Sequence, residues 1–147
     1  MTSDAKTTAS VRQVISFGQY KVSPVVSRPP DERILWGDPQ QVTWNHYTDP
    51  TGQFHAGVWQ GEPGAWRVQY DPHEEELCTL IEGRVRLTDA QGRAQEFVTG
   101  ATFVVPGGFV GTWENLTRVR KVYAIGTLRT GSEAAPDTQS ASQKTLR

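Results

Sequence analysis

The chain has 147 residues, of which 36% are hydrophobic and 21% charged, and its formal net charge is −1. This length suggests one domain, and the charge balance argues against binding to nucleic acid or a membrane surface, which needs a basic excess. Its apolar runs are shorter than the roughly 20 residues of a membrane span, and its single cysteine excludes an internal disulfide framework and a four-cysteine zinc site.

Both ends of the chain are polar. Residues 1–14 are rich in Thr and Ser, and residues 129–147 contain no aromatic or β-branched aliphatic residue. Neither segment can bury enough apolar surface to offset the entropy that ordering costs. We therefore predict disordered segments at 1–14 and 129–147 and one folded domain at 15–128. Because residues 1–14 also lack the apolar core of a signal peptide, we expect a cytoplasmic protein.

Turn-forming residues divide the central block into short segments, since the chain holds 14 Gly and 9 Pro. This pattern predicts an all-β sandwich or barrel and argues against a helical bundle. The stretch Asp89–Gly92 is a turn signal that predicts a hairpin. In chain order, the predicted strands are Trp66–Tyr70, Leu77–Ile81, Val85–Leu87, Ala94–Val98, Thr102–Val105 and Val119–Ile125, the last with a helix as its weaker competitor.

The segment Leu77–Ile81 is apolar on both faces. Cys78 and Leu80 share one face, and Leu77 and Ile81 share the other. A strand that is apolar on both sides needs a second layer behind it. Either the N-terminal part of the chain or a second subunit provides this cover, and we predict a two-fold homodimer.

Two glycine-anchored motifs follow one another along the chain. The first has the spacing G-x5-Y-x-P-x3-E-x6-G from Gly64 to Gly83, and the second has G-x5-P-x-G-x2-G-x3-N from Gly100 to Asn115. They resemble the paired motifs of the cupin superfamily, G-x5-H-x-H-x3–4-E-x6-G and G-x5-P-x-G-x2-H-x3-N. The matching positions are Gly64, Glu76, Gly83, Gly100, Pro106, Gly108 and Asn115. The resemblance implies a single-domain jelly-roll barrel, in which Gly83 and Gly100 take positive φ or tight bends.

A closer resemblance is to a small cupin subgroup related to the cupin domain of (S)-ureidoglycine aminohydrolase. It covers roughly residues 30–127 and is carried by the phrases Trp66–Tyr70, Glu76–Gly83, Gly108–Glu114 and Arg120–Tyr123. Many members of this subgroup are single-domain proteins of unassigned activity. The aminohydrolase itself is a manganese enzyme of purine catabolism with two cupin domains, whereas this chain has one.

The departures from the motif fall where the family places its metal-binding histidines. Those slots hold Tyr70, Pro72 and Gly111 here, and only Glu76 remains as an ordinary ligand. Proline and glycine offer no ligating side chain, and a metal needs three or four convergent donors. We therefore expect no cofactor. A divalent metal such as manganese remains the alternative, held by Glu76 with His73, Tyr70 or Cys78.

The same barrel frame predicts a ligand pocket with aromatic walls and one carboxylate. Trp66, Tyr70, Glu76, Cys78 and Trp113 are the candidate ligand-binding residues. The open alternative is that the rings fill a closed barrel. A carboxylate buried among them must be paired, hydrogen-bonded, metal-bound or protonated.

Glu76 is therefore the candidate catalytic residue as well as a possible structural carboxylate. Arg67, Arg86 and Lys121 are its possible partners. The sequence predicts a protein that binds a small organic metabolite inside the barrel without the histidine metal site. The alternative is a small-molecule enzyme of the ureidoglycine aminohydrolase type that uses Glu76 as metal ligand or general acid/base.

Overall fold

A computed structural model describes residues 12–128, which form eleven strands and one 3-10 turn. The elements are β1 (Val25–Ser27), η1 (Asp31–Arg33), β2 (Ile34–Gly37), β3 (Gln41–Thr48), β4 (Phe54–Gly61), β5 (Gly64–Gln69), β6 (Glu74–Glu82), β7 (Arg84–Asp89), β8 (Ala94–Val98), β9 (Thr102–Val105), β10 (Val110–Asn115) and β11 (Val119–Thr127). Within these residues no helix has the length and hydrophobicity needed to cross a bilayer.

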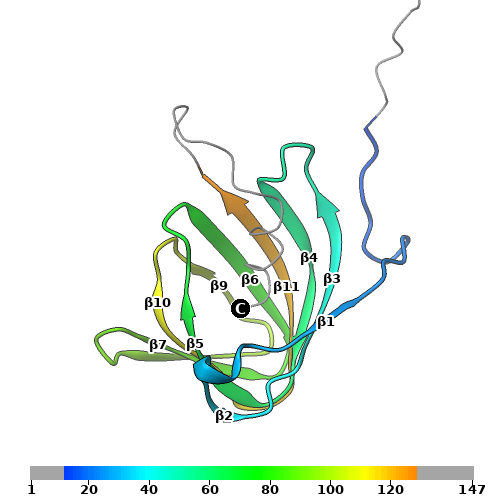
Figure 1. Cartoon of the computed structure of the whole chain (residues 1–147). Coiled ribbons are helices and arrows are strands. Elements are labelled where there is room, and N and C mark those ends of the chain that lie inside the picture. Colours follow the sequence, from blue (N-terminus) through cyan, green and yellow to red (C-terminus); the bar gives the residue numbers. More distant parts are fainter. Residues whose placement is uncertain (1–11, 129–147) are drawn as a thin grey trace, which may run out of the picture.

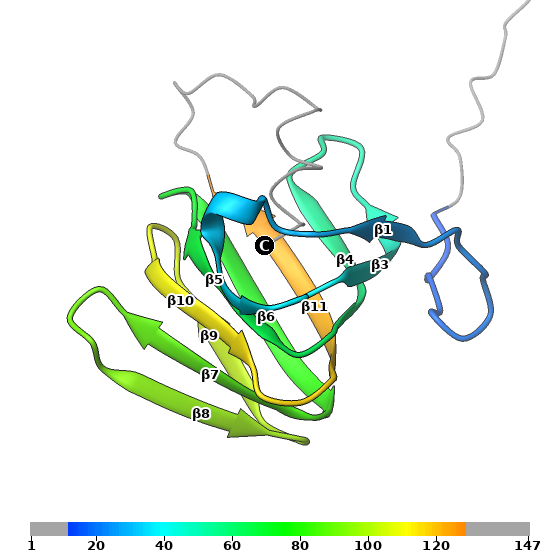
Figure 2. The same ribbon diagram turned by 60° about the horizontal axis from the view of Figure 1, so that its bottom comes forward.

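The strands form two antiparallel sheets that face each other (Figure 1). The six-stranded sheet has the order β1-β3-β4-β11-β6-β9, and the five-stranded sheet has the order β2-β5-β10-β7-β8. Figure 2 shows the β7–β8 hairpin at the free edge of the five-stranded sheet, with β10 beside it. The predicted all-β jelly roll is confirmed.

The predicted strands all lie within or overlap observed ones. β9 has the predicted bounds, and the β7–β8 hairpin closes through a bond from the Asp89 amide to the Arg93 carbonyl at 2.9 Å. The segment from Val119 is a strand and not a helix, because alternate residues of β11 are buried. Strands β1, β2, β3, β4 and β10 are not among the predicted strands. In β3 the inward-facing residues Gln41 and Thr43 are polar, so the sequence of this strand does not show the alternation of apolar and polar residues that predicts a strand.

The motif glycines have the backbone conformation that was predicted. Gly83 has φ +97° and Gly100 has φ +93°, a region that L side chains rarely adopt. At Gly83 there is also no room, because a Cβ atom would lie 2.1 Å from the Arg118 carbonyl oxygen. This close approach lets the β6–β7 turn pack against the chain that leads into β11.

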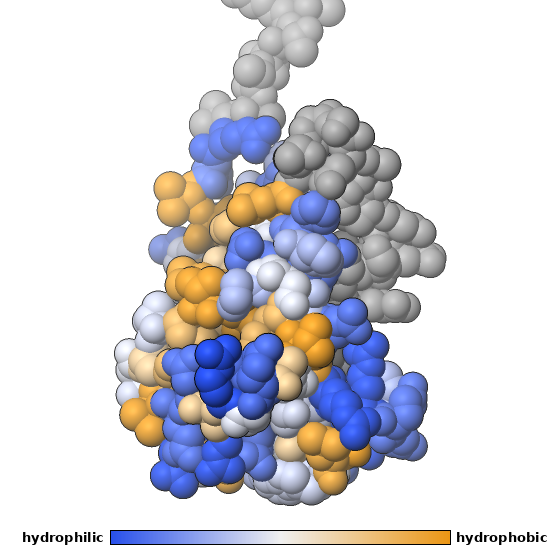
Figure 3. Space-filling view, turned by 90° about the vertical axis from the view of Figure 1, so that its left-hand side faces the viewer, coloured by the Kyte–Doolittle hydropathy of each residue, from blue (hydrophilic) through white to orange (hydrophobic). Residues whose placement is uncertain are grey.

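The residues of β6 divide between its two faces as the sequence predicted. Cys78 and Leu80 are buried between the sheets, whereas Leu77 and Ile81 are 45% and 46% exposed on the outer face. β1 pairs with β3 at the far end of the same sheet, so the described N-terminal residues do not cover this outer face. The opposite flank of the molecule, where β7 and β10 lie, mixes charged and apolar side chains (Figure 3).

The predicted terminal segments lie mostly outside the described residues. Residues 1–11 and 129–147 are not described. Residues 12–14 are exposed and have no regular secondary structure. The predicted boundaries of disorder therefore stay predictions.

Candidate functional site

An ion pair lies at the centre of the barrel. The register of β11 on β6 directs Lys121 inward, on the same side as Glu76 and Cys78. The Lys121 Nζ donates to Glu76 Oε1, and the two side chains are only 7% and 4% exposed. A charge-assisted hydrogen bond of this kind offsets part of the cost of withdrawing the ammonium and the carboxylate from water.

Two further donors converge on the same carboxylate. Cys78 Sγ lies 2.9 Å from Glu76 Oε1, and Tyr70 Oη lies 3.4 Å from Glu76 Oε2. Lys121 Nζ also lies 3.7 Å from Cys78 Sγ. Glu76 therefore acts as the acceptor at the centre of a buried polar cluster, which we call the Lys121 cluster: Lys121, Glu76, Cys78 and Tyr70.

Tryptophan rings enclose the ammonium group. Lys121 Nζ lies 4.3 Å from the ring centroid of Trp113 and 4.9 Å from that of Trp59. Both distances are within the range of a cation–π interaction. Trp66 completes the aromatic core, with ring centroids 6.4 Å from Trp113 and 6.2 Å from Trp59. The motif residue Asn115 orients Trp113 by accepting its indole N–H at 2.8 Å.

Burial sets the protonation of the neighbouring acids. Burial, followed by the charge of Glu76, raises the pKa of the Cys78 thiol well above its usual value. The same two causes raise the pKa of Tyr123, whose hydroxyl donates to Asn45 Oδ1 at 2.8 Å. At neutral pH the thiol is therefore protonated and a poor nucleophile.

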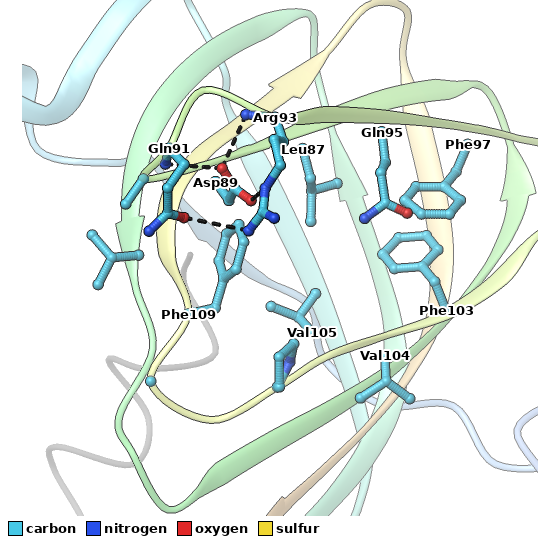
Figure 4. A pocket seen from close by; sticks show the side chains of 14 residues that line it. Leu87, Asp89, Gln91, Arg93, Gln95, Phe97, Phe103, Val104, Val105 and Phe109 are labelled. Atoms are coloured by element: carbon cyan, nitrogen blue, oxygen red, sulfur yellow. Dashed lines mark hydrogen bonds and ion pairs between the residues drawn. The ribbon is translucent and has the colours of Figure 1, made fainter.

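A pocket of about 640 Å³ opens at the mouth of the barrel, between the β7–β8 hairpin and the β9–β10 connection (Figure 4). We call it the mouth pocket. Its buried side is apolar and is formed by Leu87, Phe97, Phe103, Val105 and Phe109. Its solvent side carries the polar residues Asp89, Gln91, Arg93 and Gln95.

The polar corner of the mouth pocket is organised by Arg93. Its Nε donates to Asp89 Oδ2 at 2.7 Å, and its Nη2 donates to Gln91 Oε1 at 3.5 Å (Figure 4). Asp89 Oδ1 accepts the amides of Gln91 and Arg93, each at 2.9 Å. These backbone bonds, the Arg93 amide first, lower the pKa of Asp89, so the carboxylate is ionised and holds the hairpin turn.

Aromatic contacts join the mouth pocket to the centre of the barrel. Phe109 lies edge-on against Tyr70 with ring centroids 6.1 Å apart, and Phe103 lies 6.2 Å from Trp113. Phe103 also stacks on Phe97 at 4.0 Å. The rings of Tyr70 and Trp113 therefore form the layer behind the mouth pocket.

The EutQ-like cupin domain matches residues 48–123, which is just over half of the chain. The chain belongs to the EutQ-like cupin family. No curated protein matches this cupin.

Solved structures support the same fold. A protein of unknown function from Pseudomonas syringae pv. tomato is 31% identical with a TM-score of 0.61, and the match covers 71% of this cupin and 44% of that protein. The EutQ proteins of Clostridium difficile and Salmonella typhimurium are 15% and 17% identical, with TM-scores of 0.54 and 0.53. These two matches cover 63% and 60% of this cupin and 71% of each EutQ chain, and they show a shared fold. This cupin spans less than half of the Pseudomonas protein.

The predicted ligand-binding residues come together in this cupin, but in its closed core. Trp66, Tyr70, Glu76, Cys78 and Trp113 are all buried. None of them lines the mouth pocket. Sequence reasoning missed Trp59 and every residue of the mouth pocket. Phe103 and Val105 alternate along β9, whose bounds were predicted correctly, and this alternation was the sequence signal that could have indicated the buried side of the mouth pocket.

Among residues 12–128 no group of three or more His, Cys, Asp or Glu side chains is placed to hold a metal ion. The alternative of a divalent metal held by Glu76 with His73, Tyr70 or Cys78 stays a prediction. The His73 backbone bonds to Asp71 and Leu128 at the start of β6. One carboxylate oxygen of Glu76, Oε1, accepts the Lys121 ammonium.

Proposed function

We propose that this cupin binds a small organic molecule in the mouth pocket and does so without a metal ion. The proposal rests on the pocket itself, whose volume of about 640 Å³ falls within the roughly 300–1,000 Å³ that small-molecule sites have. An apolar buried side with a few polar groups at one end is the usual composition of such a site. The candidate residues at the barrel centre support the pocket from behind.

The polar corner indicates which end of the ligand would bind where. Arginine has five N–H donors. The bonds to Asp89 and Gln91 use two of them, and the Arg93 side chain, which lines the pocket, is 77% exposed. An aromatic or aliphatic body packed on Phe103 and Phe109 would place an acidic group near Arg93. The proposed ligand is therefore a small carboxylate or other organic anion with an apolar body.

Fluorescence of 1-anilinonaphthalene-8-sulfonate tests this proposal, because the probe combines apolar rings with an anion. We expect saturable binding to the folded protein, weakened by Arg93→Gln and by Phe109→Ala and reduced by competing benzoate. Arg67→Gln removes an exposed arginine on the outer face of β5 and is the matched control. Binding that is unaffected by both pocket variants and by benzoate would contradict the proposal.

A second candidate is an enzyme of the ureidoglycine aminohydrolase type with Glu76 as metal ligand or general acid/base. The observation that favours it is the convergence of Tyr70, Cys78 and Lys121 on Glu76 in a buried site. Elemental analysis after growth in manganese-replete medium separates the two candidates. The binding proposal expects substoichiometric metal, whereas about one ion per chain that is lost in Glu76→Gln would favour the enzyme.

We also propose that the protein is a homodimer built on the outer face of the six-stranded sheet. Exposed apolar side chains from three neighbouring strands share this face: Leu77, Ile81, Val104 and Val122. The outer face of the other sheet instead carries the ion pairs of Arg86 with Glu96 and Glu114. An exposed apolar patch on one side marks an interface, and in a two-fold dimer the patch of each copy would cover the patch of the other.

Light scattering at micromolar concentration tests the dimer. We expect twice the monomer mass, reduced to one chain by Leu77→Glu. Val110→Glu introduces the same charge on a half-exposed valine of the other sheet and should leave the dimer intact. A monomer in the unchanged protein would contradict the proposal.

A further inference from the structure

The Lys121 ammonium is surrounded by groups that bind cations. Glu76 supplies a carboxylate oxygen, Cys78 a sulfur at 3.7 Å, and Trp113 and Trp59 two ring faces at 4.3 and 4.9 Å. Lysine is almost never fully buried unless it is paired. These four side chains come from two strands of the six-stranded sheet, β4 and β6, and from β10 of the five-stranded sheet, so both sheets build the enclosure.

This enclosure lies at the carboxylate of the cupin motif. Glu76 keeps the motif's acidic residue, while Pro72 and Gly111 stand at two of its histidine positions. Removing the histidines would leave a buried carboxylate without a counter-charge, which is strongly unfavourable. In this chain β11 supplies the missing positive charge from a neighbouring strand.

We infer that the barrel centre is a cation-binding cradle for a primary ammonium group, and that its resident cation is the side chain of Lys121. The cradle consists of Glu76, Cys78, Trp59 and Trp113. This ammonium group is part of the protein chain, so the charge of the Glu76 carboxylate is balanced without a metal ion. This inference concerns the closed centre and does not depend on the ligand of the mouth pocket.

Chemical rescue tests the cradle. Lys121→Ala removes the atoms of a propylammonium ion, so n-propylammonium chloride is the matched probe and n-propanol is the uncharged control. Because the cradle is buried, the variant is unfolded in urea and refolded with each probe before its Tm is measured. The double variant Glu76→Gln/Lys121→Ala keeps the space but removes the carboxylate.

We expect Lys121→Ala to lower the Tm by roughly 10 °C or more, as for a buried charge left without its partner. Propylammonium should restore much of this loss with saturation, propanol should not, and the double variant should not respond to propylammonium. Equal rescue by propanol would show an apolar cavity and overturn the inference. Absence of rescue in the folded variant would overturn it too.

If Lys121→Ala does not fold without a probe, a second measurement and a second variant still test the inference. Circular dichroism should then show folding when propylammonium is added, and failure to fold at any probe concentration would overturn the inference. Lys121→Met fills most of the space without a charge. It should also be destabilised, and a Lys121→Met variant as stable as the unchanged protein would show that no cation is needed.

Discussion

The centre and the mouth of the barrel each contain an ion pair beside aromatic rings, yet the two pairs differ in exposure. Lys121 and Glu76 are 7% and 4% exposed, whereas Arg93 and Asp89 are 77% and 24% exposed. At the centre the desolvated charges depend on each other, so the pair is part of the structural core. At the mouth water screens the pair, which contributes little stability and leaves Arg93 available to a ligand.

This difference separates stability from recognition within one β-barrel. The cupin motif residues Glu76 and Asn115 lie at the centre, where Asn115 orients Trp113 and Glu76 pairs with Lys121, whereas the motif residues Pro106 and Gly108 line the mouth pocket. The pocket lies about one aromatic layer away, on the β7–β8 hairpin and the β9–β10 connection. Changes at the centre should therefore act on folding, and changes at the mouth should act on binding.

The largest expected effect is that of Trp113→Ala. Trp113 is fully buried and contacts Trp59, Trp66 and Phe103. Truncation should lower the free energy of unfolding by about 3–5 kcal/mol, measured by urea denaturation. A variant with near-native stability would mean that Trp113 walls an open cavity and would remove the distinction between centre and mouth.

Glu76→Gln should have the next largest effect. The amide oxygen still accepts from Lys121, but the ammonium loses its counter-charge, so we expect a loss of about 3 kcal/mol in urea denaturation. The double variant Glu76→Gln/Lys121→Met removes both charges and should recover most of this loss. Arg93→Gln at the mouth is the matched control and should change stability by less than about 0.5 kcal/mol.

The fold could be predicted from this sequence because its signals are local. Turn residues, the period of two and the glycine spacing lie within short windows, and the positive φ of Gly83 follows from its motif position. The partner of Glu76 could be narrowed only to three basic residues. Lys121 is the partner because β11 lies beside β6, and this strand order is a property of the assembled sheet. Arg86 pairs on the outer face instead.

The mouth pocket could not be predicted for the same reason. Its residues lie on the β7–β8 hairpin and around β9 and β10, and no single motif contains them. Arg93 has the sequence context of an ordinary exposed turn residue. Only the packing of the hairpin over Phe103 and Phe109 gives it a place beside an apolar surface.

The centre and the mouth should differ in the rate at which a thiol placed there reacts with a disulfide reagent. The buried Cys78, with its raised pKa, should not react with a disulfide reagent such as dithionitrobenzoate until the barrel opens. An opening free energy of at least about 4 kcal/mol would slow the reaction by about 10³. Gln95→Cys places a thiol at the exposed side of the mouth and should react without delay. Fast reaction of Cys78 in the folded protein would show that the centre is accessible.

The smallest expected effect is acid weakening of the mouth. The pKa of Asp89 is lowered in the folded protein, chiefly by its bond from the Arg93 amide. A group whose folded pKa lies below its unfolded value stabilises the structure above that unfolded value, which is about 3.9 for Asp, and the contribution is lost as the pH falls further. Naphthalene-sulfonate binding should therefore weaken below about pH 4, while near-ultraviolet circular dichroism still reports a packed core. Asp89→Asn keeps the oxygen that accepts the two amides but does not titrate, so its binding should lose this pH dependence. An unchanged acid transition in Asp89→Asn would assign the weakening to another group and leave Asp89 without a role in shaping the pocket.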